Sequence, residues 1–434
     1  MAERFFVKNF GCRAAQADGA ALESGLASRG LSAAKDWKQA DVVVLNTCTV
    51  TATADDEVRQ TVRRIRREQP SARIVVTGCY AQRAPEELAA LEGVSLVVGN
   101  SDKTRIPELV AGEHYHGGIE IHDIFSPYDF LSAPVEDAAG ERTRPNLKIQ
   151  DGCNNRCSFC IIPYVRGRSR SAPVEQVLAQ VQTLSAKYCE VVLSGINLGR
   201  WGRDFPADDP KSKVRLADLI RLLLERTGVE RLRFSSVEPM DFSDDLLHLM
   251  ASSERIAKHV HAPLQSGSDT VLRRMHRKYR PRHYADRIWK ARELMPDCAV
   301  GADVMTGFLG ETDREFEESH AFIEALPFTY LHVFTYSERP GTPAAESTAQ
   351  VPQAVRKART RALRDLAARK NLAFRQSLLG KTVSSVTLDN GTALSSNYVK
   401  VKLAHSRAPN RLVNLEAGGL TADGVSETGS LFVL

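Results

Sequence analysis

Short apolar runs alternate with helical patterns over the first hundred residues of the chain. The apolar runs cover residues 4–10, 41–46, 73–78 and 95–99. Helix-periodic segments follow the second and third of these runs, at residues 55–68 and 85–91. Continuous Val, Leu and Ile runs interspersed with helices are typical of a parallel sheet with helices on its faces. The pattern therefore predicts an open α/β domain.

Six further strand-like runs alternate with helical stretches in the middle of the chain. They cover residues 146–150, 189–195, 231–236, 259–265, 299–307 and 330–336. Repeated strand–helix units of this kind predict a partial (βα)6 barrel that is not fully closed. In barrels of this class the chemistry lies at the carboxyl ends of the strands.

The end of the chain has a different pattern. A long amphipathic helix is predicted over residues 353–376, and four short strand-like segments follow at 381–391, 397–404, 411–418 and 429–434. These segments predict a small β-barrel. Its proportions suit an RNA-binding module, although a structural cap would have the same pattern.

The fold class predicted for the whole chain is therefore α/β, with three domains. The polar segment at residues 132–145 contains Pro and Gly, has no periodicity and is typical of a linker. It separates an N-terminal domain at residues 1–131 from a barrel domain at 146–372. The small β-barrel occupies residues 373–434.

Composition favours an ordinary globular enzyme. Hydrophobic residues make up 43% of the 434 positions and charged residues 26%, and the formal net charge is only +5. No apolar run approaches the length that spans a bilayer, and the N-terminal residues have no signal-peptide pattern, so we expect a cytoplasmic protein and no membrane partner. Eight cysteines in such a chain indicate metal ligation or catalysis before disulfides.

Three cysteines within DGCNNRCSFC carry the most specific signal. Cys153, Cys157 and Cys160 have the spacing C-x-x-x-C-x-x-C. Three thiolates on one loop hold three irons of a [4Fe-4S] cluster and leave the fourth open to a small chelating molecule. Structural zinc is the alternative, but it needs four ligands and no second cysteine pair follows nearby. Ordinary core cysteines would not need a loop rich in Asn, Asp and Gly.

A second cysteine triple follows the first three apolar runs. Cys12, Cys48 and Cys79 each come almost directly after a predicted strand. Because ligands collect at the carboxyl ends of parallel strands, we expect these cysteines to converge and bind a second [4Fe-4S] cluster. Each could instead be a small buried hydrophobe. The remaining two, Cys189 and Cys298, lie at strand beginnings and are interpreted as core residues.

Small and polar residues follow the barrel strands. Such residues approach a nucleoside closely and hydrogen-bond its ribose and amino-acid ends, although turn chemistry alone also explains Ser and Gly at these positions. The candidate cofactor-binding residues are Ser194, Gly195, Asn197, Ser235, Glu238, Gln265 and Gly307. No catalytic residue beyond the cluster ligands is predicted. Two histidines in strands, His261 and His332, alternate with apolar neighbours and are interpreted as satisfied internal residues.

Basic segments offer candidate RNA contacts. Aromatic residues are interleaved with Arg and Lys at residues 164–170 and 273–283, a combination that suits single-stranded RNA. Solvated loops are an equally good interpretation of both segments. The helix at residues 54–68 carries five arginines off its apolar stripe, which a solvated face explains better than RNA contact. These are Arg59, Arg63, Arg64, Arg66 and Arg67.

Specific motifs then occur in the order typical of one family. NFGC, NTCTVT, VTGCYAQ, GCNNRCSFCIIPYVRG, LQSGSDTVLRRM and YSERPGTPAA resemble the radical S-adenosylmethionine (radical SAM) methylthiotransferases across essentially the full chain. The terminal module resembles a TRAM domain. NTCTVTATAD and IIPYVRGRSRS look most like the branch that converts N6-threonylcarbamoyladenosine (t6A) at tRNA position 37 to its 2-methylthio derivative. The isopentenyladenosine (i6A) branch and the ribosomal-protein S12 branch are similar in architecture and remain alternatives.

The resemblance implies a radical reaction on the anticodon stem-loop of tRNA. The adenine C2–H bond is unactivated, so no acid or base removes its hydrogen and a radical is needed. One electron delivered through the Cys153/Cys157/Cys160 cluster would cleave SAM to methionine and a 5′-deoxyadenosyl radical. The other cluster would present sulfur, and a second SAM would methylate it. An electron donor and a sulfur source are implied partners. A non-catalytic iron–sulfur RNA-binding scaffold is the alternative of another class.

Overall fold

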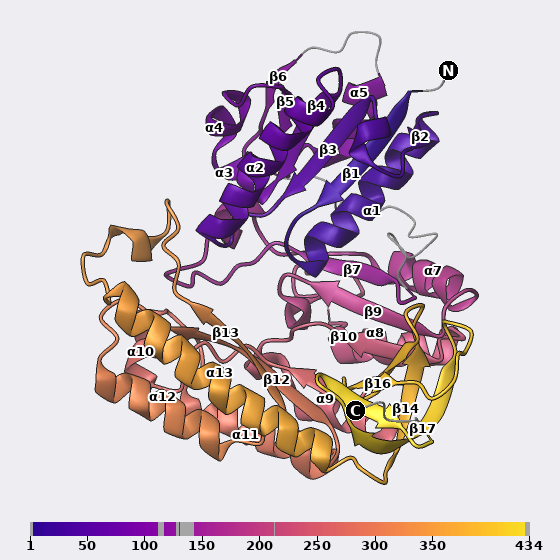
Figure 1. Cartoon of the computed structure of the whole chain (residues 1–434), viewed down its shortest axis with the longest axis vertical. Coiled ribbons are helices and arrows are strands. Elements are labelled where there is room, and N and C mark those ends of the chain that lie inside the picture. Colours follow the sequence, from indigo (N-terminus) through magenta and orange to yellow (C-terminus); the bar gives the residue numbers. More distant parts are fainter. Residues whose placement is uncertain (1–2, 112–116, 127–129, 131–142, 212, 430–434) are drawn as a thin grey trace. The chain divides into compact units, whose positions relative to one another are not determined.

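The computed structural model describes residues 3–111, 117–126, 130, 143–211 and 213–429 (Figure 1). Internal contacts divide the chain into two compact units. Unit 1 contains Met1–Glu136, Asn146–Ala172 and Ser337–Ala345, and unit 2 contains Asp137–Pro145, Pro173–Tyr336 and Glu346–Leu434. Both cysteine triples therefore belong to unit 1.

Unit 1 is built on a six-stranded parallel sheet. Its strands are β1 (Arg4–Asn9), β2 (Ser32–Ala33), β3 (Val42–Thr47), β4 (Arg73–Gly78), β5 (Val94–Val98) and β6 (Gly118–Glu120). They are ordered β2-β1-β3-β4-β5-β6, and every pair is parallel. The four predicted strands are confirmed. β2 and β6 were not predicted, because two or three residues give no readable alternation.

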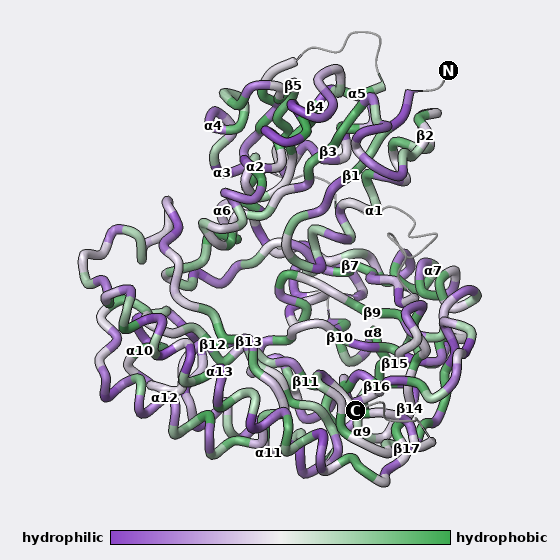
Figure 2. The backbone as a smooth tube through the Cα atoms, viewed as in Figure 1, coloured by the Kyte–Doolittle hydropathy of each residue, from purple (hydrophilic) through white to green (hydrophobic). Residues whose placement is uncertain are grey.

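Helices cover both faces of this sheet, as predicted. They are α1 (Arg13–Ser28), α2 (Ala52–Glu68), α3 (Cys79–Arg83), α4 (Pro85–Ala89) and α5 (Ile106–Ala111). Val42 and Val44 of β3 pack with the core that includes α1 and α5, while Val43 and Leu45 pack with the core that includes α2. Figure 2 shows the hydrophobic residues concentrated in the strands of this sheet. The predicted apolar stripe of α2 is fully buried.

The remainder of unit 1 surrounds the second cysteine triple. Strand β7 (Asn146–Asp151) leads into the cysteine loop, helix α6 (Ile162–Val165) follows the loop, and β8 (Arg170–Ser171) pairs antiparallel with the end of β7. The predicted linker at residues 132–145 lies mainly outside the described residues.

Unit 2 contains the predicted series of strand–helix units. Its parallel strands are β9 (Glu190–Gly195), β10 (Arg231–Phe234), β11 (His259–His261), β12 (Ala299–Thr306) and β13 (Tyr330–Thr335). The helices that alternate with them are α7 (Val174–Ser185), α8 (Leu216–Arg226), α9 (Asp244–Ser252), α10 (Asp269–Arg274), α11 (Pro281–Leu294) and α12 (Asp313–Ala325). β11 is shorter than predicted and ends at His261. Beyond it, Gln265 adopts a left-handed φ of 65°.

A closed five-stranded barrel ends unit 2. Helix α13 (Gln353–Gln376) leads to strands β14 (Thr382–Thr387), β15 (Thr392–Ser395), β16 (Lys400–Lys402), β17 (Leu412–Leu420) and β18 (Gly424–Glu427). The predicted helix and small barrel are confirmed. β15 and β18 were not predicted, and residues 430–434 of the predicted last strand lie outside the described residues.

Candidate metal and cofactor site

Three neighbouring strands carry the first cysteine triple. Cys12 caps α1 shortly after β1, Cys48 directly follows β3, and Cys79 directly follows β4 as the first residue of α3. Because β1, β3 and β4 are adjacent in the sheet, their carboxyl ends share one edge. Cys48 is close enough to Cys79 and Cys12 for their thiolate charges to raise its pKa. The structure thus brings these three thiols together.

Gly11 is part of this arrangement. Its φ is +87°, and a Cβ built there would lie 2.6 Å from the Sγ of Cys48. Any side chain at this position would collide with a thiol and would also be strained in its backbone conformation. The glycine of NFGC therefore lets the backbone beside Cys12 approach Cys48.

The chemistry of these thiols fits a metal cluster. Burial raises the pKa of Cys48 to about 12, and the nearby Cys79 and Cys12 add to the rise. A thiolate at Cys48 is therefore costly in the protein alone, and cationic iron would relieve the mutual repulsion of three thiolates. None of the eight cysteines is in a disulfide.

The second triple lies on a loop with constrained geometry. Gly152 has φ +68°, and a Cβ there would lie 2.0 Å from the carbonyl oxygen of Arg168. The Cys153 amide donates to the Gly167 carbonyl at 3.1 Å, and the Asn155 amide donates to the Cys153 Sγ at 3.4 Å. Cys157 is buried, whereas Cys153 and Cys160 are partly exposed. The loop thus carries one buried and two partly exposed cysteines.

The two triples are neighbours within unit 1. Cys79 forms a small buried cluster with Ile161 and Val165, and Ile161 directly follows Cys160. Helices α3 and α6 are accordingly in contact. The sequence did not predict this adjacency, because the two triples are separated by more than seventy residues.

The segment 337–345 contacts both cysteine loops. Arg339 donates to the carbonyl of Thr49, next to Cys48, at 3.3 Å, and pairs with Asp55 at 2.8 Å. The Ala344 amide donates to the carbonyl of Ser158, between Cys157 and Cys160, at 2.8 Å. The YSERPGTPAA motif therefore fixes the backbone of both triples, a role that sequence reasoning missed.

A buried ionic network lies beside the thiols. Asp18 of α1 accepts from Lys103 at 2.8 Å and from Arg166 at 2.9 Å, and also pairs with Lys148. Asp151 accepts from Lys148 at 2.8 Å and from Arg166 at 2.9 Å. Burial alone would raise the pKa of Asp18, but its three cationic partners hold it well below the usual range.

This network has three cations and two carboxylates and so carries one excess positive charge. Arg166 is also electrostatically coupled to Cys12, Cys48 and Cys79. A buried positive charge stabilises nearby thiolates, so the network suits an anionic cluster. Sequence reasoning missed it, although an aspartate among alanines in α1 and a lysine in apolar β7 were readable signals.

The candidate SAM-binding residues follow the ends of four unit 2 strands. Ser194 and Gly195 end β9, Ser235 follows β10, Gln265 follows β11 and Gly307 follows β12. Ser235 Oγ is buried and has no hydrogen-bond partner among the residues that the structure describes. The Ser235 hydroxyl therefore has hydrogen-bonding capacity that no described residue uses.

Other members of this candidate set already have protein partners. Asn197 is buried and caps a 3₁₀ turn. Glu238 pairs with Arg277 at 2.5 Å, and the Gly307 amide donates to Glu311 at 2.8 Å. Glu238 and Gly307 thus make hydrogen bonds that stabilise the protein itself.

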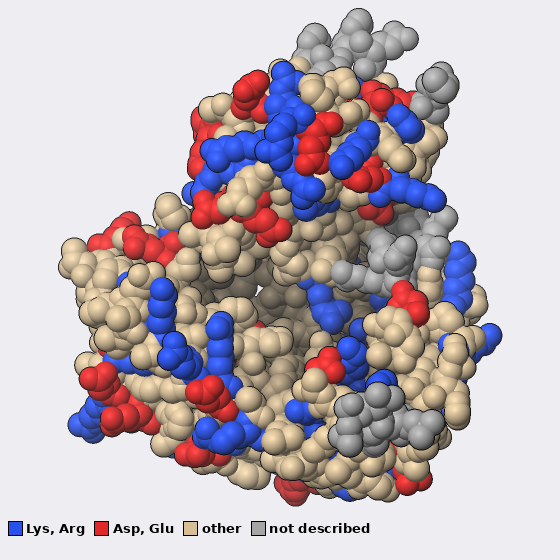
Figure 3. Space-filling view, viewed as in Figure 1, with Lys and Arg blue, Asp and Glu red and all other residues tan. Residues whose placement is uncertain are grey.

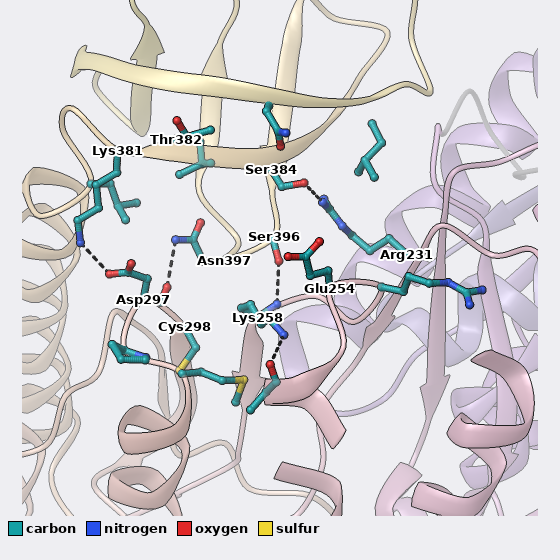
Figure 4. A pocket seen from close by; sticks show the side chains of 18 of the residues that line it. Arg231, Glu254, Lys258, Asp297, Cys298, Lys381, Thr382, Ser384, Ser396 and Asn397 are labelled. Atoms are coloured by element: carbon teal, nitrogen blue, oxygen red, sulfur yellow. Dashed lines mark hydrogen bonds and ion pairs between the residues drawn. The ribbon is translucent and has the colours of Figure 1, made fainter. Parts of the chain in front are cut away.

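A pocket of about 720 Å³ lies at the opposite ends of the strands (Figure 4). Arg231 at the start of β10 and Cys298 just before β12 line it, together with Lys381, Ser384 and Asn397 of the terminal barrel. It is therefore not the predicted cofactor site. Cys298 is fully buried and Cys189 is also buried, which confirms both as core residues.

The basic segments differ in part from the RNA-binding interpretation. Arg166, Arg277 and Tyr279 are buried and hydrogen-bonded inside their units, so these three side chains are not available for RNA contact. Arg168, Arg273 and Lys278 in the same segments are exposed, and their RNA contact stays a prediction. On α2, Arg59 pairs with Asp56 and Glu87. Figure 3 shows basic and acidic side chains interspersed over this part of unit 1. The α2 arginines thus form a solvated, ion-paired face.

The two strand histidines have different environments. His261 is buried and hydrogen-bonds Tyr330 at 2.8 Å, as expected of an internal histidine. The side chain of His332 is 52% exposed, so its prediction as an internal residue is wrong. The exposure of His332 could not be predicted from its position in the middle of β13, because it depends on which residues cover that face of the sheet.

Comparison with known proteins agrees with this architecture. The radical SAM superfamily matches residues 147–323, and the uncharacterized protein family UPF0004 matches residues 4–99. A radical SAM methyltransferase from Kitasatospora setae, TsrM, solved with tryptophan and a SAM analogue, has a TM-score of 0.56 and 17% identity, covering 80% of this chain and 75% of that one. This likeness shows the fold.

Curated relatives define the family further. The threonylcarbamoyladenosine tRNA methylthiotransferase MtaB of Aquifex aeolicus is 34% identical over 94% of this chain and 98% of its own length. MtaB of Bacillus subtilis is 43% identical over 76% of this chain and 72% of its own length. The tRNA-2-methylthio-N(6)-dimethylallyladenosine synthase of Clostridium novyi is 32% identical over 88% of this chain and 84% of its own length.

The chain belongs to the radical SAM methylthiotransferase family. This membership confirms the predicted enzyme class, a transferase, and the predicted cofactors, SAM and [4Fe-4S] clusters. Among the described residues, no helix is long and apolar enough to cross a membrane.

Proposed function

We propose that this enzyme methylthiolates t6A at position 37 of tRNA, forming 2-methylthio-t6A. The observation that carries the proposal is the adjacency of two cysteine triples in unit 1, where Cys79 contacts the residue after Cys160. Two neighbouring sites suit a reaction in which one centre opens a C–H bond and another delivers sulfur. The relative with the higher identity, 43% against 32%, is named for t6A and not for the dimethylallyl substrate.

Each cysteine triple has a role in this proposal. Cys153, Cys157 and Cys160 hold the radical-generating cluster, and Cys12, Cys48 and Cys79 hold the sulfur-presenting cluster. When bound, these groups and SAM supply the radical chemistry at C2 of adenine and the sulfur and methyl group of the product. The protein itself orients the reactants, since Arg339 and Ala344 hold the backbone of both loops.

The SAM contacts are assigned to the strand ends of unit 2. Ser194, Gly195, Asn197, Ser235, Glu238, Gln265 and Gly307 form the proposed set. Ser235 is its best-supported member, because its buried hydroxyl has no partner among the described residues. Glycine at position 307 allows a left-handed turn, with φ +68°, close to the end of β12.

The proposed partners follow from the reaction. The anticodon stem-loop of tRNA is the substrate, and the terminal barrel at residues 373–434 is its proposed RNA-binding module. An electron donor and a sulfur source complete the reaction. We expect the protein in the cytoplasm, where tRNA is modified.

Nucleoside mass spectrometry of tRNA from cells that lack the gene tests the proposal. We expect 2-methylthio-t6A to disappear, t6A to accumulate, and the wild-type gene but not Cys157→Ala to restore the product. Loss of 2-methylthio-i6A instead would assign the enzyme to the i6A substrate, and loss of a modification on ribosomal protein S12 would assign it to that protein. Purified protein that releases no 5′-deoxyadenosine under reducing anaerobic conditions would favour a scaffold.

A further inference from the structure

The sheet of β11, β12 and β13 has two different faces. Thr306 and Thr335 both contact the hydroxyl of Thr360 on α13, at 2.7 and 2.8 Å. Figure 1 shows α13 running along β12 and β13. Side chains alternate along a strand, so Asp303 and His332 lie on the face away from α13. We call this the inner face.

A polar cluster lies on the inner face. The carboxylate of Asp303 is 3.2 Å from Nε2 of His261 and 3.1 Å from Nδ1 of His332. Tyr330 Oη lies 2.8 Å from Nδ1 of His261 and 2.6 Å from Nε2 of His259. These side chains thus orient one another from three adjacent strands.

One edge of this cluster is open. His332 is 52% exposed and Phe334, two residues further on the same face, is 49% exposed, whereas Val333 between them is only 6% exposed. Asp303 already engages Nδ1 of His332, so Nε2 is the ring nitrogen that remains for a ligand. A hydrogen-bonding group beside an exposed aromatic ring suits a ligand with a flat ring and a polar substituent.

The structure assigns His332, oriented by Asp303, to recognition of the threonylcarbamoyl substituent on N6 of the target adenine. This inference rests on the proposed function. The substituent carries a carboxylate, a hydroxyl and ureido N–H groups, which can hydrogen-bond Nε2 of His332. A dimethylallyl substituent offers no hydrogen bond and would cover Nε2 of His332 without giving it a partner, which is costly. The cluster therefore selects t6A over i6A.

A bound cation is the main competing role for two histidines and one carboxylate. The observations favour the substrate, because both carboxylate oxygens of Asp303 already have a ring nitrogen within 3.2 Å. A cation would have to displace these contacts. Its presence is directly measurable and is included in the test.

The test compares t6A and i6A substrates with the reconstituted holoenzyme. We would measure kcat/KM for tRNAs that carry t6A or i6A at position 37, with the wild type, His332→Phe and Asp303→Asn. Loss of a hydrogen bond to a charged group lowers the t6A/i6A ratio by about 10- to 100-fold. His248→Phe is the matched control, because His248 is exposed on α9, and its ratio should equal the wild-type ratio.

Three outcomes would overturn the inference. The first is an unchanged ratio in His332→Phe, provided that the variant retains its iron and its unfolding temperature. The second is an equal loss on both tRNAs, which assigns the cluster a structural role. The third is a metal ion beyond the cluster irons that is lost in Asp303→Asn. A wild-type enzyme that acts on i6A but not on t6A would instead contradict the proposed function itself.

Discussion

Asp18 and Arg166 form an ion pair 2.9 Å long, and their side chains are only 1% and 2% exposed. Asp18 lies on the helix that Cys12 caps, and Arg166 follows the loop that carries Cys153, Cys157 and Cys160. The pair therefore links the two cysteine sites within unit 1.

Loss of this pair should destabilise the protein strongly. Asp18→Asn leaves Arg166, Lys103 and Lys148 buried with too little negative charge, so we expect a loss of about 3–5 kcal/mol in the free energy of unfolding. Denaturant unfolding measures it. Glu92→Gln is the matched control, because the pair of Glu92 with Arg66 is exposed and should contribute no more than about 1 kcal/mol. Equal effects in the two variants would contradict a structural role for the network.

Buried carboxylates should make the stability depend on pH in the acid range. Burial opposes ionisation of Glu190, but Arg233, Arg144 and Arg231 lower its pKa from 4.5 to about 2. A depressed folded-state pKa contributes stability that is present above the unfolded value and lost as the pH falls. We therefore expect the unfolding temperature to drop between about pH 4.5 and 2, and to drop less steeply in Glu190→Gln. An identical slope in that variant would assign the acid sensitivity to other groups, such as Asp18 and Asp151.

Local patterns predicted the elements of the fold well but not the partners of polar residues. The runs that became β3, β4, β12 and α13 were readable because a buried strand or an amphipathic helix repeats one local rule. The burial of Asp18 and the exposure of His332 depend instead on residues far away in the sequence. Lys103 lies eighty-five positions from Asp18, and local periodicity carries no signal for such a pair.

The same limit applies to the candidate site. Strand ends predicted that Cys12, Cys48 and Cys79 would meet, since the rule for parallel sheets needs only strand order. The roles of Arg339 and Ala344 could not be predicted in this way. They come from a segment almost three hundred residues beyond Cys48, and only the folded chain brings it to both loops.

Iron content should reveal two independent clusters. Anaerobic reconstitution of the wild type should give about eight irons per chain. Changing Cys153, Cys157 and Cys160 together to Ala should leave about half of the iron, because Cys12, Cys48 and Cys79 form a separate site with its own ligands. Chemical iron analysis checks this number. Complete loss of iron, or zinc in place of iron, would contradict the two-cluster assignment.

The two cysteine sites should have separable activities. Cys48→Ala should abolish methylthiolation but still cleave SAM, because the other triple keeps its own ligands. Cys157→Ala should abolish both activities. Product analysis for 5′-deoxyadenosine and for 2-methylthio-t6A measures the two steps. A folded Cys48→Ala protein that retains its second cluster but cannot cleave SAM would show that the division of roles is wrong.

The terminal barrel should contribute to tRNA binding through exposed basic residues. Deletion of residues 376–434 is a poor test of this contribution. Arg233 is buried and donates to the carbonyls of Ser395 and Ser396 at 3.0 and 3.2 Å, and the deletion would remove these two acceptors. Point substitutions keep these hydrogen bonds in place.

Lys402 and Arg411 are exposed on the barrel, so Lys402→Glu with Arg411→Glu changes its charge without disturbing a buried residue. We expect weaker tRNA binding, and a plot of log affinity against log salt whose slope falls by about one for each phosphate that the variant no longer neutralises.

Arg314→Glu on α12 is the control, because its side chain is 89% exposed and lies outside the barrel. Fluorescence anisotropy with labelled tRNA at several salt concentrations measures both quantities. Unchanged affinity and slope in the double variant would show that these two residues have no part in tRNA binding. That result would favour a structural role for the barrel, through its hydrogen bonds with Arg233.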